Sequence, residues 1–301
     1  MKRTSFVLIL GSVVALAVAQ CQARSDESAA PPVRPTLTRV LFLYGSVPPG
    51  TDPSEMIRIG NTGRNGYAQL ASLLHDEQGH NLYELIDTDS EVNPLTQAAL
   101  SWYHLVVLGS NNRRYSPQEA AALGAFVNRG GSVLALSDSR FGLSPDRSTN
   151  ALGAGELSDN DLMQQFGMQI EHDNYQVVTV ESKRFVDPAH PLLYGLTSFR
   201  GEGVSLIKTL GSPAQIVVRG DGLLLTDGHT ITGPEYAITA VATVGLGRVA
   251  ATFDRNTFFN AGVGSDGTDI GELDNRQYAR NLFNWLARPL APPGISDNSS
   301  N

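Results

Sequence analysis

Small and polar side chains follow four apolar runs of the sequence, residues 39–44, 104–108, 132–137 and 248–253, which have the pattern of buried strands. In an open α/β sheet, ligands bind at the carboxyl ends of the strands. The candidate ligand-binding residues at these ends are Ser46, Ser110, Asn111, Asp138, Ser139, Asp254 and Asn256. The alternative is that they are ordinary loop residues, because strand-to-helix loops are polar in any case.

A long polar loop, residues 45–65, follows the first of these strands. Long loops in compact domains are often functional, and Arg58, Arg64 and Asn65 can contact an anionic or sugar ligand from it. The alternative is a surface loop without a ligand. Residues 45–66 contain five glycines but no dinucleotide-binding or Walker pattern, so the sequence predicts no nucleotide site and no cofactor.

Metal binding has little support in the sequence. There is no HExxH motif, cysteine cluster or paired histidine. Four acidic residues, Asp266, Asp269, Glu272 and Asp274, lie in a glycine-rich loop and have oxygen ligands suited to calcium. They lack the EF-hand spacing, and acidic residues before a helix also favour its N-terminal dipole, so we predict no metal.

The first half of the chain alternates strands and helices. Apolar spacing predicts helices over 67–75 and 94–102, with a strand over 82–86 between them. The clearest helix start is at Ser116, where Pro117 and Glu119 complete a capping box, and Gly130-Gly131 ends that helix. Such alternation indicates parallel βαβ units in a doubly wound sheet.

The second half is less regular. It contains a helix that starts at Ser158 and ends at Phe166, and a closing helix over 275–287 with Tyr278, Leu282, Trp285 and Leu286 facing inward. Further strands are expected over 176–180, 215–218, 223–226 and 236–244, and Gly245-Leu246-Gly247 has the pattern of a hairpin turn. We therefore predict an α/β fold whose mostly parallel sheet has antiparallel additions in the second half.

The N-terminal residues indicate export. Lys2 and Arg3 precede an apolar stretch over 6–19 that ends in Ala-Val-Ala, so residues 1–19 read as a signal peptide. Residues 20–36 read as a linker, 37–288 as the folded domain and 289–301 as a disordered tail. Removing Lys2 and Arg3 from a net charge of −8 gives −10, and without a basic stripe nucleic acid is not an expected partner.

The only cysteine, Cys21, stands where a lipoprotein carries its acylated cysteine. Gln20 occupies a position that normally holds a small residue in lipoproteins, which favours a freely periplasmic or secreted form. Lipidation at Cys21 is the alternative, and it is the one membrane contact that we expect. In either case the folded domain contains no thiol chemistry.

The order of segments resembles the class I glutamine amidotransferase-like superfamily, in particular its non-glutaminase branch of gliding-motility ABC-transporter auxiliary and trehalose-utilisation-type domains. The similar stretches are Tyr103–Ser110, Ser116–Asp138, Asp187–Leu196, Gly247–Asn260 and Asn281–Leu286. The resemblance implies a flavodoxin-like sheet. It implies less about function, because members of this branch often lack a catalytic triad.

In glutaminase relatives, the nucleophilic cysteine follows the strand that here ends at Leu136. This chain has Ser137 at that position, with small residues two before and two after it, as in a nucleophile elbow. A serine nucleophile needs a base. Among the histidines, His190 is the best candidate for this base, although Pro188 and Pro191 make its segment a stiff turn.

Two hypotheses follow. The first is an exported, non-catalytic domain that binds a small polar ligand or a cell-envelope protein. The second is a serine hydrolase or amidase that uses Ser137 and His190. A sugar-processing role has only the analogy with trehalose-utilisation relatives behind it.

Overall fold

The computed structural model describes residues 38–44, 58–75, 83–89, 94–109, 114–137, 154–171, 177–202, 205–224, 228, 230–262 and 268–287. The chain divides into two units, Met1–Thr36 and Leu37–Asn301, and all of these residues belong to the second. The predicted signal peptide, linker and tail, and Cys21, lie outside them. Within the described ranges, no helix is long and apolar enough to cross a membrane.

The first half folds as the sequence predicts. Its elements are β1 (Thr38–Tyr44), α2 (Ala68–His75), β2 (Tyr83–Asp89), α3 (Gln97–Leu100), β3 (Leu105–Leu108), α4 (Pro117–Asn128) and β4 (Ser132–Leu136). The capping box is confirmed, because the Ser116 side chain accepts from the Glu119 amide and the Glu119 carboxylate accepts from the Ser116 amide. Helix α3 is shorter than expected, a single turn capped by Thr96.

The second half holds more short elements than the sequence indicates. They are α5 (Ala154–Met163), η3 (Gln164–Phe166), β5 (Met168–Ile170), β6 (Val177–Glu181), η4 (Ser182–Arg184), η5 (Pro191–Leu193), β7 (Ser198–Glu202), β8 (Ile207–Thr209), β9 (Gln215–Arg219), β10 (Tyr236–Val244), β11 (Gly247–Thr252), η6 (Asn256–Phe258) and α6 (Asn275–Ala287). One prediction was wrong in detail, because Ser158 lies inside α5 rather than at its start. Of the strand expected over 223–226, residues 223 and 224 are described, and they contribute a bridge between Leu224 and Thr230.

The predicted fold class is confirmed. In the described part of the chain, nine strands form one sheet, with the order β2-β1-β3-β4-β11-β10-β8-β5 and β9 paired to β10. The five strands from β2 to β11 are parallel and have the flavodoxin-like order 2-1-3-4-5. The pairs beyond β11 are antiparallel, beginning with the β10–β11 hairpin.

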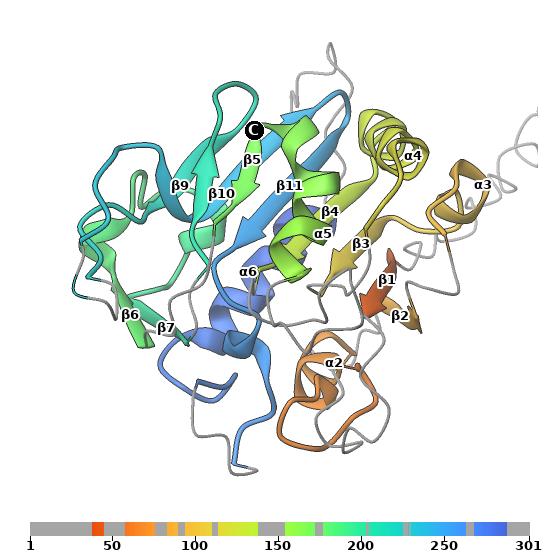
Figure 1. Ribbon diagram of the computed structural model, residues 1–301. Coiled ribbons are helices and arrows are strands. Elements are labelled where there is room, and N and C mark those ends of the chain that lie inside the picture. Colours follow the sequence, from red (N-terminus) through yellow and green to blue (C-terminus); the bar gives the residue numbers. More distant parts are fainter. Residues whose placement is uncertain are drawn as a thin grey trace, which may run out of the picture. The chain divides into compact units, whose positions relative to one another are not determined.

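Helices cover both faces of this sheet. Helix α5 passes in front of the strands and α6 behind them (Figure 1). Strands β3 and β4 are buried throughout, because each face is covered. Helix α6 buries Tyr278, Leu282 and Leu286, while Trp285 is half-buried. This arrangement brings the carboxyl ends of β1, β3, β4 and β11 to one edge of the sheet, which we call the carboxyl edge.

Candidate functional site

The strand order predicts where a ligand would bind. From β1, the chain moves to β2 on one side and later to β3 on the other, so the order reverses between β1 and β3. The crevice outside the carboxyl ends of two such strands is the usual ligand position in an open α/β sheet. Here those ends are at Tyr44 and Leu108.

Residues 58–67 come from the long loop and approach this point. The exposed Arg58 places its guanidinium carbon 4.2 Å from the centre of the Tyr44 ring. The Arg58 carbonyl accepts from the amides of Asn61 and Tyr67, at 3.2 and 2.9 Å. Arg64 is half-buried and Asn65 is buried. This part of the loop is therefore folded against the strand ends.

A second set of contacts ties this loop to the segment after β11. The Asn260 side-chain amide donates to the carbonyls of Asn61 and Gly63, at 2.8 and 2.6 Å. The Tyr67 hydroxyl donates to the carbonyl of Arg255, at 3.4 Å. Arg255 itself is 1% exposed, which is unusual for arginine. The carboxyl edge therefore carries arginine side chains and a loop that hydrogen bonds hold in place.

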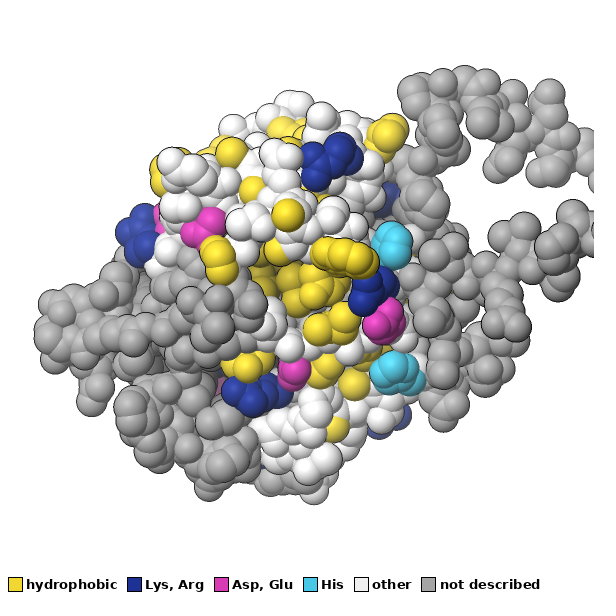
Figure 2. Space-filling view, turned by 90° about the vertical axis from the view of Figure 1, so that its right-hand side faces the viewer, with side chains coloured by type: hydrophobic (Ala, Val, Ile, Leu, Met, Phe, Trp, Pro, Cys, Tyr) yellow, Lys and Arg dark blue, Asp and Glu magenta, His cyan; other side chains and the backbone are white. Residues whose placement is uncertain are grey.

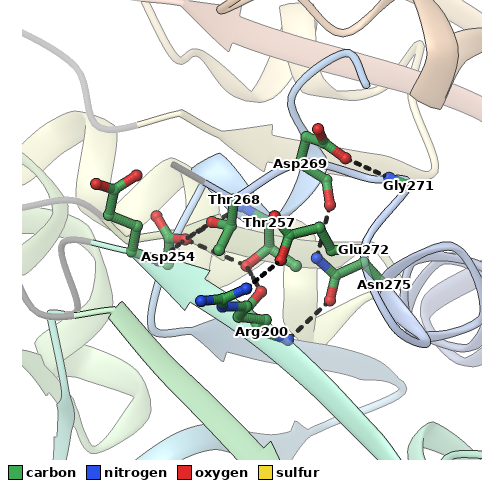
Figure 3. A network of polar contacts seen from close by, with 9 residues as sticks. Arg200, Asp254, Thr257, Thr268, Asp269, Gly271, Glu272 and Asn275 are labelled. Carbon is green, nitrogen blue, oxygen red and sulfur yellow. Dashed lines mark hydrogen bonds and ion pairs between the residues drawn. The ribbon is translucent and has the colours of Figure 1, made fainter. Parts of the chain in front are cut away.

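Asp254, which we predicted to contact a ligand, instead accepts hydrogen bonds from within the protein (Figure 3). Its fully buried carboxylate accepts from the amides of Glu202, Asn256 and Thr257, at 2.8, 2.8 and 3.1 Å. The Thr257 and Thr268 hydroxyls lie 3.3 and 3.4 Å from its Oδ2 atom. Asp254 therefore stabilises the turn after β11 and holds β7 against it.

Three of the four predicted acidic side chains are likewise held by internal contacts, while Asp266 lies outside the described residues. Glu272 forms an ion pair with Arg200 at 2.9 Å, and the Asp269 carboxylate accepts from the Gly271 amide at 2.7 Å (Figure 3). Asp274 accepts from the Thr197 and Ser198 amides. Among the described residues, no group of three acidic, histidine or cysteine side chains is arranged to hold a metal.

Partial burial raises the pKa of Asp274, but the hydrogen bonds from Ser198 and Thr197 together lower that pKa further, below its ordinary value. The charged carboxylate is therefore the form that fastens the start of α6 to β7.

Ser137 has an unusual environment. It is fully buried directly after β4, and its amide donates to the Thr252 carbonyl at 3.0 Å. Its hydroxyl has no hydrogen-bond partner within the described residues. Buried hydroxyls are normally paired, so this one stands out.

His190, the proposed base, lies at the opposite end of the strands. Its ring is 5.8 Å from that of Trp285, over which the Arg248 guanidinium also lies, at 5.1 Å. Arg248 pairs in register with Ser132, the first residue of β4, whereas Ser137 follows the last. At about 3.3 Å per residue, Ser132 and Ser137 are about 16 Å apart along β4. The structure thus does not bring Ser137 and His190 together.

The His190 ring instead makes a structural hydrogen bond. Its Nδ1 atom accepts from the Leu192 amide at 3.2 Å and caps η5. Burial lowers the pKa of His190; nearby Asp187 raises it, while Arg248 lowers it. The neutral ring is therefore favoured, as the capping contact requires.

The other predicted residues divide into two groups. Asn256 is half-buried, and its amide donates to Asp254. The remaining ligand candidates lie outside the described residues; they are Ser46, Ser110, Asn111, Asp138 and Ser139.

One buried polar cluster was not predicted from the sequence. The Tyr278 hydroxyl lies 2.7 Å from that of Thr239 and 2.9 Å from that of Thr252. Burial raises the pKa of Tyr278 to about 12. The two threonines face each other across β10 and β11, which the hairpin register would have indicated.

Comparisons with known proteins identify a family and a shared fold. A family model described as "Domain of unknown function (DUF4350)" matches residues 59–283. No curated protein matches the sequence.

Among solved structures, the mmIFT52 N-terminal domain has a TM-score of 0.53 and 13% identity, over 83% of this chain and 97% of that one. This likeness shows a shared fold. A putative ThuA-like protein from Bacteroides uniformis aligns over 85% of this chain and 95% of its own, with a TM-score of 0.49 and 13% identity. A β-galactosidase from Rahnella sp. R3 aligns over 83% of this chain and 31% of its own, with a TM-score of 0.47 and 15% identity.

Proposed function

Because the chain belongs to the DUF4350 family, a domain of unknown function, we propose a function from the geometry of its site. The protein is an exported, non-catalytic domain of the glutamine amidotransferase-like type. It binds a small polar ligand at the carboxyl edge, or presents that edge to a cell-envelope protein. The observation that carries this proposal is the separation of Ser137 from His190 by the length of the strands.

The surroundings of Ser137 support a non-catalytic role. A serine attacks only when a neighbouring base takes its proton. Within the described residues, its hydroxyl has no hydrogen-bond partner at all. The carboxylate of Asp254, which follows the neighbouring strand β11, already accepts from three backbone amides.

The loop over residues 58–67 supports binding. It is fixed against the switch point of the sheet by Asn260 and Tyr67, so little conformational entropy would be lost when a ligand binds. It carries Arg58 and Arg64, which favour a ligand with carboxylate, phosphate or hydroxyl groups.

The binding proposal can be tested by recording amide NMR spectra with glutamate, citrate, inorganic phosphate, glucose and maltose. We expect at least one of these compounds to shift the amides of residues 58–67 and Gly109. An Arg58→Ala variant should weaken that binding, whereas Arg129→Ala, an exposed arginine after α4, should not. If every compound leaves these amides unchanged, a small-ligand site at this edge is ruled out.

One observation favours the alternative, a serine hydrolase or amidase. The Ser137 hydroxyl follows β4 as in a nucleophile elbow and has no hydrogen-bond partner among the described residues. Hydrolysis of p-nitrophenyl esters and anilides separates the two functions. We expect the wild type and a Ser137→Ala variant to have equal, background rates; loss of a measurable rate in the variant would favour the hydrolase.

A further inference from the structure

An aromatic and charged cluster lies at the opposite, amino edge of the sheet. It consists of Arg39 in β1, Glu84 in β2, and Trp102, Tyr103 and His104 between α3 and β3; we call it the Trp102 platform. Figure 2 shows apolar, basic, acidic and histidine side chains together on this face of the molecule. None of these residues belongs to the site proposed above.

Backbone contacts hold the platform in place. The amide of Trp102 donates to Ala99 at 3.3 Å, and the amide of Tyr103 donates to Leu100 at 3.1 Å. His104 is bound to Arg39 twice, because its amide donates to the Arg39 carbonyl at 2.8 Å and its Nδ1 atom accepts from the Arg39 amide at 2.9 Å. The connection from α3 to β3 is therefore fastened to the start of β1.

The Arg39 side chain contacts Glu84, Trp102 and Tyr103. Its Nε and Nη2 atoms lie 2.9 and 3.4 Å from the two carboxylate oxygens of Glu84. Its guanidinium carbon is 5.9 Å from the ring centres of both Trp102 and Tyr103. These distances are within the range of cation–π attraction. The ion pair cancels the charge of the platform and orients its polar atoms before any ligand arrives.

The platform leaves an aromatic surface and several polar groups open to solvent. Trp102 is 66% exposed, more than any other described tryptophan or phenylalanine. Because Nδ1 of the exposed His104 accepts a hydrogen bond, the neutral ring carries its proton on Nε2 and can donate there. The Glu84 side chain, 44% exposed, keeps lone pairs that can accept.

We propose that the Trp102 platform binds the ring of a neutral carbohydrate. The C–H face of a pyranose is apolar and stacks on an indole, while its hydroxyls both donate and accept hydrogen bonds. The platform offers this combination, an exposed indole beside a donor at His104 and an acceptor at Glu84. Its compensated charge favours a neutral ligand over an ionic one.

The same face is less suited to a second copy of this chain. Strand β2, at the edge of the sheet, carries Glu84 and Asp87, so two copies pairing through this edge would bring like charges together. A protein interface also needs an apolar centre of several side chains. Among the described residues from 38 to 137, Trp102 is the one large apolar side chain that is exposed, and the Arg39–Glu84 ion pair lies beside it.

The test uses the indole N–H signals of the protein, which has two tryptophans, Trp102 and Trp285. Maltohexaose, cellohexaose and N-acetylchitohexaose are titrated separately into the full-length protein. We expect at least one to shift the Trp102 signal and leave that of the half-buried Trp285 unchanged. Trp102→Ala should weaken binding about tenfold or more, and Trp102→Phe less, because the smaller ring still stacks.

Tyr194→Ala is the matched control, since Tyr194 is 77% exposed and contacts Asn281 only through its carbonyl. Its affinity should equal that of the wild type, and both alanine variants should melt as the wild type does. The proposal is overturned if no oligosaccharide shifts the Trp102 signal, or if Trp102→Ala binds as tightly as the wild type. Dissociation of a wild-type dimer by Trp102→Ala, without sugar binding, would assign the platform to self-association instead.

Discussion

The two edges of the parallel sheet use their polar side chains differently. At the carboxyl edge, the buried Asp254 and Asn260 side chains bond to the protein's own backbone. At the amino edge, Trp102 and His104 extend into solvent although Arg39 holds them in place. A polar side chain at a strand end can therefore bind a ligand only where it is not already bonded to the neighbouring loops.

This difference has a structural cause. Residues 58–67, which precede α2, contact the segment after β11 at the carboxyl edge through Asn260 and Tyr67. At the amino edge, the described connection from α3 to β3 consists of residues 101–104 and leaves Trp102 and His104 exposed. Substitutions that remove these internal hydrogen bonds of the carboxyl edge should therefore affect stability most.

The largest effect is expected for Asp254→Ala. It removes the acceptor for the amides of Glu202, Asn256 and Thr257 in a fully buried place. We expect the free energy of unfolding to fall by about 3 kcal/mol or more, since buried unpaired donors are costly. Chemical denaturation measures it. A loss below about 1 kcal/mol would mean that water satisfies these amides.

Tyr278→Phe should have the next largest effect. It leaves the buried Thr239 and Thr252 hydroxyls without their shared partner, at a cost of about 1–3 kcal/mol. Adding Thr239→Val and Thr252→Val should recover part of that loss, because no unpaired hydroxyl then remains. A double-mutant cycle of the denaturation free energies tests this, and purely additive losses would contradict it.

Ser137→Ala should be neutral or stabilising, by up to about 1 kcal/mol. The substitution removes a fully buried hydroxyl that has no partner in the described residues. Thermal unfolding of the two proteins measures the difference. A clear loss of stability would show that the hydroxyl makes a contact with residues beyond the described ranges.

The smallest effect is expected at His190, and it depends on pH. Since the folded-state pKa of His190 is lowered, the unfolded chain binds the proton more readily, and stability falls as the pH drops below the ordinary histidine value. His190→Asn retains an acceptor for the Leu192 amide but does not titrate. Between about pH 7 and pH 5, this variant should lose less stability than the wild type. Parallel stability curves would contradict the assignment.

Most of the fold was predictable because its signals are local. The capping box at Ser116 and the apolar stripe of α6 gave those helices within a residue. The sequence did not indicate β5, β7 and β8, which have three to five residues each and are held by pairing with distant strands. Ser158 failed as a cap because α5 begins at Ala154.

The site was less predictable, since residue type does not reveal which partner a side chain finds. Asp254 was identified as a ligand residue, yet it bonds to Glu202, fifty-two positions earlier. His190 was considered as a base from its position in the sequence, whereas the register of Arg248 with Ser132 places it at the other edge. The partner of Asp254 and the position of His190 both depend on the strand register, which only the folded sheet shows.

The central claim is that Ser137 is not an activated nucleophile. Treating the full-length protein with a fluorophosphonate, followed by peptide mass spectrometry, tests it directly, because this reagent labels serines whose hydroxyl is activated by a base. We predict no adduct on the peptide that contains Ser137, at reagent levels that label a serine hydrolase completely. A stoichiometric adduct at Ser137 that is absent from the Ser137→Ala variant would contradict the binding-domain account.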